Sequence, residues 1–373
     1  MLTLIKYLST ALIYANSFKK KYNIKLLIFY ENFFIKIKKL FYNVIQVISF
    51  KNKFSKFSYS KKFLNFFFLN QVNCKDIIFC SDENFLNKLD FYKILPLQKK
   101  IELNYDGIGY VYDLQHIHYS RNFSKSDRNF RDKIFLDILN SYRKVLVNSN
   151  YIKKMIYKKY KNFISKIYVI PFFPYPEEKL LLDNTNSVKI YNIKNNFFLI
   201  SNQFWKHKNH KIAFEAFKNF LKYNDNFVLV CTGRTEDRRF PNYFYNLKKK
   251  YSDLINKKKI IILGEIPKIH QINLLKKCTA LIQPTLYEGG PGGFSTYEAI
   301  AYGRPVILSD IEVNKEIKNE NVYFFKSNNS YQLTKLMLNN IESLNTNLSK
   351  KNLIKKGNSN KKKLGDFLLK LID

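Results

Sequence analysis

The chain of 373 residues is long enough for two ordinary domains, each with its own hydrophobic core. Hydrophobic residues make up 46% of it, which excludes a disordered protein. The formal net charge is +35, yet only eight of the 64 basic residues are arginine, the side chain preferred for bidentate contacts with bases and phosphates. We therefore interpret the charge as compositional drift toward AT-rich codons and expect no nucleic-acid partner, although a basic surface attracts other anions.

The cysteines and the first residues bear on the compartment. Cys74, Cys80, Cys231 and Cys278 are scattered without CxxC spacing, which predicts free thiols in a reducing compartment. No apolar run approaches the ~18 residues of a membrane span. The opening residues MLTLIKYLSTALIYANSF predict an amphipathic helix, because Lys6 interrupts the apolar run and no small-residue cleavage site follows. The expected location is the cytoplasm, with a peripheral position at the inner face of the membrane left open.

The first half alternates apolar strand candidates with helical stretches. Strands are expected at residues 24–30, 75–80, 108–114, 144–149 and 167–172. A helix should follow the fourth strand, with Ser149 or Asn150 as its N-terminal cap. The polar residues 176–196 are expected to form a connector.

The second half repeats the alternation, with strands expected at residues 197–201, 227–233, 260–264, 280–285, 305–310 and 322–325. Continuous apolar strands that alternate with helices predict parallel sheets covered on both faces. We therefore expect an α/β protein of two Rossmann-like, doubly wound domains that face each other across a cleft. Their predicted bounds are 1–185 and 186–355, followed by a basic tail and a terminal helix at 356–373; the charge run 349–363 is interpreted as solvated.

The segment LIQPTLYEGGPGGFSTYEAIAYGRPVILSD, residues 281–310, carries the clearest functional signal. Four of the 11 glycines lie between Glu288 and Glu298, where a strand leads into a helix. Ligands of open parallel sheets bind at such places, and glycines with a helix N-terminus can hold an anion. Glu298, expected in the first turn of the helix, suits a ribose diol, and Glu288 suits the hydroxyls of a second sugar. The pattern predicts a nucleotide-sugar site; a glycine-rich turn with a capping glutamate is the alternative.

This segment resembles the glutamate–glutamate signature of the retaining glycosyltransferases of family 4, which have the GT-B fold. EGGPGGFSTYEAIAYGRPVILSD keeps both glutamates and much of the pattern that follows them, but nine residues separate the glutamates where the family usually has seven. The resemblance implies an acceptor-side domain at 1–185 and a donor domain at 186–355. Family members usually open with a strand and a glycine-rich loop. Here the helix comes first, so that strand is expected to be missing.

Two further blocks carry the resemblance. FFLISNQFWKHKNHKIAFEAF, residues 197–217, is similar to the first strand, loop and helix of the family's donor domain, where a basic residue meets the diphosphate. The donor site implied by the resemblance consists of Asn202, Gln203, Lys208, Gly290, Gly292, Gly293, Phe294, Ser295 and Glu298. Ile266 and Pro267 are assigned to the region of the nucleotide base.

The block GYVYDLQHIHYSRNF, residues 109–123, resembles the strand end where the family carries a histidine that points into the cleft. His116 fits that position best and His118 is the second candidate. The resemblance thus assigns catalytic roles to His116 and Glu288. A histidine just past an apolar strand is otherwise more often a packed or capping residue.

The resemblance implies that the protein moves a sugar from a nucleoside diphosphate donor, such as a UDP- or GDP-hexose, to a hydroxyl of a sugar, glycan or lipid-linked acceptor. Transfer would proceed with retention and without a metal or cofactor, in polysaccharide or glycolipid assembly. The basic, aromatic first domain would suit an anionic membrane surface. Three alternatives stay open, namely a nucleotide-sugar epimerase of the same fold, a catalytically impaired relative that binds a partner or glycan, and a basic nucleic-acid binder with steeply salt-dependent affinity.

Overall fold

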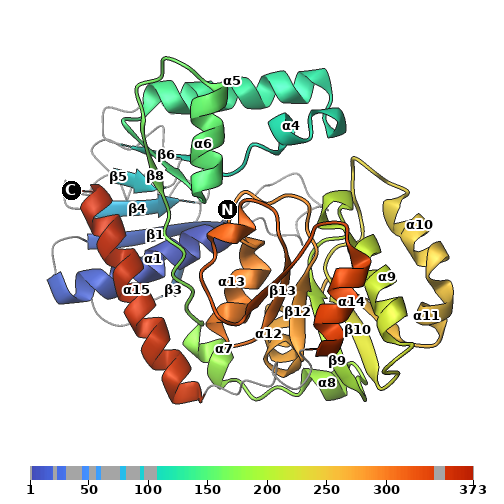
Figure 1. Cartoon of the computed structure of the whole chain (residues 1–373). Coiled ribbons are helices and arrows are strands. Elements are labelled where there is room, and N and C mark those ends of the chain that lie inside the picture. The colour runs from blue at the N-terminus through green and yellow to red at the C-terminus, as the bar shows by residue number, and fades with distance from the viewer. Residues whose placement is uncertain are drawn as a thin grey trace.

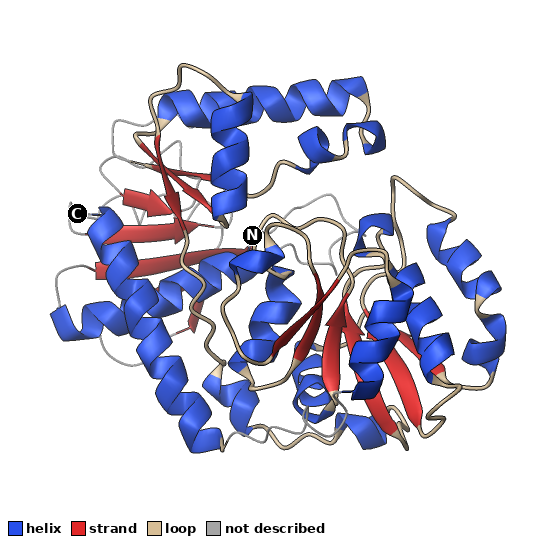
Figure 2. Cartoon of the chain, in the orientation of Figure 1, coloured by secondary structure: helices blue, strands red, loops and turns tan. Residues whose placement is uncertain are grey.

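The computed structural model describes residues 2–19, 23–30, 44–49, 56–59, 76–80, 93–95, 107–339 and 349–372. These residues form two α/β halves, each with sheets covered by helices (Figures 1 and 2). Among the helices of the described residues, none has the length and apolar character that crossing a bilayer requires.

The N-terminal half contains two sheets. The first, in the order β3-β2-β1-β4-β5, consists of β1 (Asn23–Tyr30), β2 (Val44–Ser49), β3 (Lys56–Tyr59), β4 (Asp76–Cys80) and β5 (Lys93–Leu95). The second is parallel and consists of β6 (Ile108–Val111), β7 (Lys144–Val147) and β8 (Lys166–Val169). All five predicted strands of this half are present, with β2, β3 and β5 in addition. β2 runs antiparallel to β1 and to β3; such strands lack the continuous apolar runs that revealed the parallel ones.

The C-terminal half is one parallel sheet in the order β11-β10-β9-β12-β13-β14. Its strands are β9 (Asn196–Ser201), β10 (Phe227–Thr232), β11 (Ile260–Gly264), β12 (Ala280–Gln283), β13 (Val306–Ser309) and β14 (Val322–Phe325), all six of them predicted. From β9 the order runs outward through β10 and β11 on one side and through β12 to β14 on the other. The order therefore reverses between β9 and β12, and that switch point is where open α/β sheets bind ligands.

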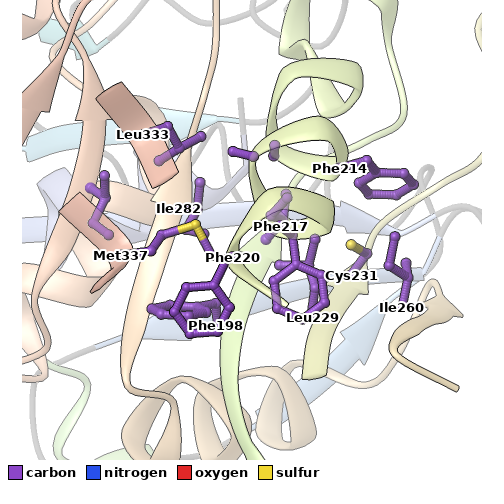
Figure 3. Close-up of a cluster of buried hydrophobic side chains, with 14 of the residues drawn as sticks. Phe198, Phe214, Phe217, Phe220, Leu229, Cys231, Ile260, Ile282, Leu333 and Met337 are labelled. Carbon is purple, nitrogen blue, oxygen red and sulfur yellow. The ribbon is translucent and has the colours of Figure 1, made fainter. Parts of the chain in front are cut away.

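Phenylalanines dominate the core of the C-terminal half (Figure 3). Phe198 of β9 packs with Phe214, Phe217 and Phe220 of α9 (His210–Phe220), all fully buried. Helix α14 (Ser330–Asn339) closes the same cluster with Leu333 and Met337. Such burial stabilises a sheet face that is covered by helices, since each large apolar side chain contributes about 1.5–3 kcal/mol.

Two of the four cysteines can be placed. Cys231 and Cys278 are free and buried, as expected, and burial raises the pKa of both thiols. Cys74 and the side chain of Cys80 lie outside the described residues.

The remaining helices of the described chain cover the sheets or connect them. They are α1 (Leu2–Lys19), α4 (Gln115–His118), α5 (Lys125–Ser141), α6 (Asn150–Lys159), α7 (Glu178–Leu182), α8 (Ser187–Ile190), α10 (Tyr243–Lys250), α11 (Ser252–Asn256), α12 (Lys268–Lys277), α13 (Gly293–Ala301) and α15 (Lys350–Ile372). Short 3-10 turns occur at η2 (Ser120–Asn122), η3 (Lys206–Lys208) and η4 (Asn314–Glu316).

The predicted connector 176–196 is not purely a linker, because α7 and α8 lie in it and Leu181 is buried in the core of the C-terminal half.

The chain ends in a helix that returns to the N-terminal half. In Figure 1, α15 runs beside α1, and Leu364 and Leu368 share a buried cluster with Leu8 and Leu12. Gly365 allows this approach, because a Cβ there would clash with the backbone of α1. The charge run 349–363 is therefore mostly the first half of α15, most of whose lysines face solvent. The boundary predicted at 355, between the second domain and the tail, falls inside this helix. Helix α1 is the first described element and precedes β1.

The N-terminal cap of α6 also connects the two halves. Ser149, as predicted, accepts a hydrogen bond from the backbone N–H of Ile152 at 3.1 Å, and its hydroxyl donates to the carbonyl of Gly289 at 3.0 Å.

We expect Ser149→Ala to lower the free energy of unfolding by about 2 kcal/mol, since it removes a cap and a buried bond between halves. The matched control is Ser124→Ala, which removes the exposed cap of α5, a hydrogen bond from Asp127 N at 3.0 Å. This substitution should lower the free energy of unfolding by about 1 kcal/mol. Urea unfolding of both variants measures the difference. Equal costs would show that the bond to Gly289 contributes nothing.

Candidate active site between the two halves

The loops after β9 and β12 meet at the switch point through one ion pair. Lys208, at the end of η3, places its Nζ 2.5 Å from Oε1 of Glu288. The two residues are only 8% and 9% exposed, so each charge depends on the other for compensation. The structure thus brings together two predicted site residues that lie 80 positions apart in the chain.

A buried glutamine that sequence reasoning missed supports this pair. Gln283, at the end of β12, has no solvent exposure. Its Nε2 donates to the carbonyl of Gly292 at 2.8 Å and lies 3.4 Å from Glu288 Oε1, and its Oε1 accepts from the side-chain amide of Asn202. Gln283 therefore fixes the glycine loop against the loop after β9. An amide inside the apolar run ALIQPT was the available signal.

The four glycines of the loop serve two different purposes. A Cβ on Gly289 would clash with the carbonyl of Tyr112, and one on Gly290 would lie 2.9 Å from Cβ of Asn148. These two glycines thus allow the strand ends of the N-terminal half to approach the loop closely. The sequence had instead predicted close approach of a ligand at these positions. Gly292 and Gly293 have φ of +67° and +66°, a left-handed conformation that disfavours other residues. They turn the chain into α13.

The first turn of α13 has the features of an anion site. Its N–H groups have no acceptor within the helix, and the positive end of the helix dipole lies there. The side chain of Ser295 is buried, and its hydroxyl has no hydrogen-bond partner in the described part of the chain. Phe294 beside it is 40% exposed. The N–H groups of Gly292 and Gly293 are already bonded, to Asn314 Oδ1 at 2.8 Å and to the carbonyl of Gly290 at 3.2 Å, so a ligand would meet the groups from Phe294 onward.

Glu298 lies one turn deeper than predicted. Helix α13 begins at Gly293, so Glu298 is in its second turn. Its carboxylate is 7% exposed and lies 2.5 Å from Nζ of Lys268, the residue that follows the loop after β11. Burial raises the pKa of Glu298, and Lys268 opposes that shift. Glu298, Lys268 and Phe294 line a cavity of about 600 Å³ together with Tyr7 of α1.

The other predicted donor residues line a second cavity. Asn202, Gln203 and Ile266 surround about 350 Å³ at the carboxyl ends of β9, β10 and β11. Arg234, which was not assigned to the site, lines the same cavity and pairs with Glu265 at 2.8 Å on the surface. Pro267 is exposed at the N-terminal cap of α12.

The two histidine candidates have different surroundings. The imidazole of His116 is 1% exposed, and its Nε2 lies 3.0 Å from Oδ1 of Asp132 on α5. It packs inside the N-terminal half, because the short helix α4 turns it toward α5. His118, on the opposite side of that helix, lines a cavity of about 240 Å³ with Glu288 and Asp310. Of the two histidines, the one that shares a cavity with Glu288 is thus the second candidate.

Burial favours the neutral form of both imidazoles. Burial lowers the pKa of His118, whose Nδ1 lies 3.0 Å from the hydroxyl of Tyr151. Burial also lowers the pKa of His116, against the opposing effect of Asp132. A neutral imidazole beside a carboxylate can accept a hydrogen bond from a hydroxyl group.

Comparisons with known proteins bear on the fold that carries this site. Residues 183–359 match the model of the family described as Glycosyl transferases group 1. No curated protein matches the chain. Among solved structures, sucrose-phosphate synthase from Thermosynechococcus elongatus is 14% identical with a TM-score of 0.54, and the match covers 78% of this chain and 69% of that one.

Two further structures are similar. The match to HepE from Anabaena, in complex with UDP and glucose, has 12% identity, a TM-score of 0.53 and coverage of 79% of this chain and 87% of that one. The match to the UDP-forming α,α-trehalose-phosphate synthase of Burkholderia vietnamiensis has 10% identity, a TM-score of 0.55 and coverage of 83% and 75%. At such identities the likeness concerns the fold. The chain has the GT-B fold of two Rossmann-like halves, and its residues 183–359 are similar to the domain described as Glycosyl transferases group 1.

Proposed function

We propose that the protein is a hexosyltransferase that uses a nucleoside diphosphate sugar as donor and a hydroxyl group as acceptor. The observation that carries the proposal is the Lys208–Glu288 pair, which lies at the switch point of a group 1 domain beside a cavity that both halves line. A UDP- or GDP-hexose would place its diphosphate at Lys208 and the first turn of α13, and its ribose at Glu298.

Charge compensation explains how this site would assist departure of the diphosphate. As the bond between the anomeric carbon and the phosphate oxygen breaks, negative charge grows on the phosphate and positive charge on the sugar ring. Lys208 and the helix end are fixed near the first charge, and Glu288 near the second, in a site with little water. In the free protein Glu288 compensates Lys208, so a bound diphosphate would take over part of that role.

We further propose retention at the anomeric carbon, as in family 4, without a metal or cofactor. The acceptor oxygen would form the new bond on the face that the diphosphate leaves. The proton of the acceptor hydroxyl would pass to the departing phosphate oxygen, so that no external base is consumed. His118 would orient the reacting hydroxyls through its neutral ring. The basic lysines and the helix dipole supply the positive charge that a metal would otherwise supply.

The histidines can be separated by substitution. We expect His118→Ala to lower kcat by about 100-fold with little change in the KM of the donor, because the side chain lies beside Glu288 and acts on the transferred group. His116→Ala should mainly lower the melting temperature, since the imidazole is buried and its partner is Asp132 of α5. Steady-state kinetics and thermal melting of both variants give the comparison. A larger loss of kcat in His116→Ala would return the catalytic role to that residue.

The cellular setting proposed is polysaccharide or glycolipid assembly at the cytoplasmic side, with a sugar, glycan or lipid-linked acceptor. The lysine-rich N-terminal half would then meet an anionic membrane surface. Nucleic acid is not among the proposed partners.

Binding of the product nucleotide tests the donor site before any acceptor is known. Isothermal titration with UDP and with GDP is expected to show saturable binding of at least one of them to the wild-type chain. Absence of binding by a folded protein would favour the alternative of a catalytically impaired relative that binds a partner or glycan. A nucleotide-sugar epimerase would bind the nucleotide too, but nuclear magnetic resonance of the products would then show an altered sugar on an intact nucleotide.

A further inference from the structure

A further cavity lies next to the proposed transfer site and is lined by none of the residues assigned to the donor. It measures about 780 Å³ and is enclosed by α4 and α6 on one side and by the loop that carries Glu312 and Glu316 on the other. It shares His118, Tyr151 and Glu312 with the smaller cavity that contains Glu288. A molecule in the larger cavity could therefore present a hydroxyl group toward Glu288.

The carboxylates of this cavity are already engaged. Glu316 accepts hydrogen bonds from the backbone N–H groups of Asn150 at 2.9 Å and Tyr151 at 2.7 Å, so it compensates the N-terminus of α6. Glu312 pairs with Lys315 at 2.7 Å. The lining lysine Lys159 pairs with Asp132 at 3.5 Å, outside the cavity.

Two lysines of the cavity have no such compensation. Lys154 and Lys158 lie one turn apart on α6, on the face that lines the cavity, and neither has a carboxylate partner within the described part of the chain. Ile117 and Met155 supply an apolar surface beside them. The cavity thus offers two positive charges next to a small apolar surface, close to the position where a sugar would be transferred.

We propose that this cavity binds the acceptor and that the acceptor carries a phosphate group, held by Lys154 and Lys158. A phosphate monoester carries about two negative charges at neutral pH and a diester carries one, so the two uncompensated lysines would attract either. The apolar surface would cover the part of the acceptor between its phosphate and its reacting hydroxyl. This inference rests on the proposed function, which supplies the sugar donor. The phosphate can belong to a soluble sugar phosphate or to a lipid.

Chemical labelling tests the phosphate site without any turnover. Pyridoxal 5′-phosphate forms a Schiff base with lysines near a phosphate site, and pyridoxal is its matched probe without phosphate. After borohydride reduction, mass spectrometry is expected to find Lys154 or Lys158 labelled about tenfold more by the phosphorylated probe, which corresponds to about 1.4 kcal/mol. Lys153, on the same helix but outside the cavity lining, is the control. Equal labelling of Lys153 and the two cavity lysines would overturn the proposal.

Kinetics then distinguishes a sugar phosphate from a lipid phosphate. It also tests the acceptor proposal separately from the proposed function. Wild-type protein is assayed with a hexose, a hexose 6-phosphate, and mixed micelles that contain diacylglycerol or phosphatidylglycerol. We expect kcat/KM to be at least about tenfold higher for one phosphorylated acceptor than for its neutral partner. The double variant Lys154→Gln/Lys158→Gln should abolish this preference for the phosphorylated acceptor while the KM of the donor stays the same. Transfer without any preference for phosphate contradicts this inference alone. Phosphate-dependent labelling without transfer or nucleotide binding contradicts the proposed function alone.

Discussion

Lys208→Met is expected to lower the free energy of unfolding by about 3–5 kcal/mol and to reduce donor affinity by about 100-fold. Methionine keeps the length of the side chain but leaves the carboxylate of Glu288 buried without its cation, and an uncompensated buried charge has this cost. The affinity loss has a separate cause, because Lys208 would contact the diphosphate directly. Urea unfolding gives the first quantity and isothermal titration of UDP or GDP gives the second.

A second substitution separates these two effects. Lys208→Met/Glu288→Gln removes both charges, so stability should return to within about 1 kcal/mol of the wild type, as when a buried ion pair is replaced by neutral groups. Donor affinity should stay low because no cation faces the phosphate. Recovery of both properties in the double variant would mean that Lys208 serves the fold only.

Glu298→Ala is expected to weaken donor binding by about 2–3 kcal/mol, or roughly 30- to 150-fold, through loss of a charged acceptor for two ribose hydroxyls. The fold should tolerate the change, because Lys268 is 45% exposed and can be solvated when its partner is absent. Isothermal titration of the nucleotide measures the loss, and unchanged affinity would remove Glu298 from the site. The matched control is Glu215→Ala, which removes a carboxylate on α9 that is paired with Lys250 and lines none of the cavities described above.

The pH dependence of Glu298 has a defined sign. Its pKa is raised above the ordinary value of 4.5, chiefly by burial. A group with a raised pKa in the folded state contributes stability that is present below 4.5 and is lost as pH rises through the raised pKa. Donor affinity should change in the opposite direction and rise over the same interval, because the ionised carboxylate accepts the ribose hydroxyls. Glu298→Gln should show neither dependence.

The sequence predicted the parallel part of the fold well because buried parallel strands are continuous apolar runs. All six strands of the C-terminal sheet follow from that signal, whereas their order, and with it the switch point between β9 and β12, comes from the structure. The signal fails for β2 and β3, which pair antiparallel and contain no continuous apolar run, since Gln46 interrupts β2 and polar residues alternate with aromatic ones in β3. It also misses the start of α15, where the lysines of residues 349–363 outnumber the apolar residues. The predicted terminal helix within 356–373 is the later part of α15, and its Leu364 and Leu368 pack on α1.

The candidate site was predictable in its charged residues and less so in their arrangement. Lys208 and Glu288 come from loops after adjacent strands, and the structure pairs them. Gln283 could not be predicted as their support, because its role depends on which atoms its amide meets inside the protein. The choice between His116 and His118 depends on the direction of a four-residue helix, which no periodic pattern can fix.

Release of nucleoside diphosphate tests the central claim most directly. Purified protein is incubated with UDP- and GDP-hexoses and a set of hydroxyl acceptors, and the free nucleotide is quantified for the wild type and for the folded variant Lys208→Met/Glu288→Gln. We predict acceptor-dependent release by the wild type with at least one donor and a loss of about 100-fold in the variant. No release by the wild type with any donor, or equal release by both proteins, would contradict the assignment of sugar transfer to this site.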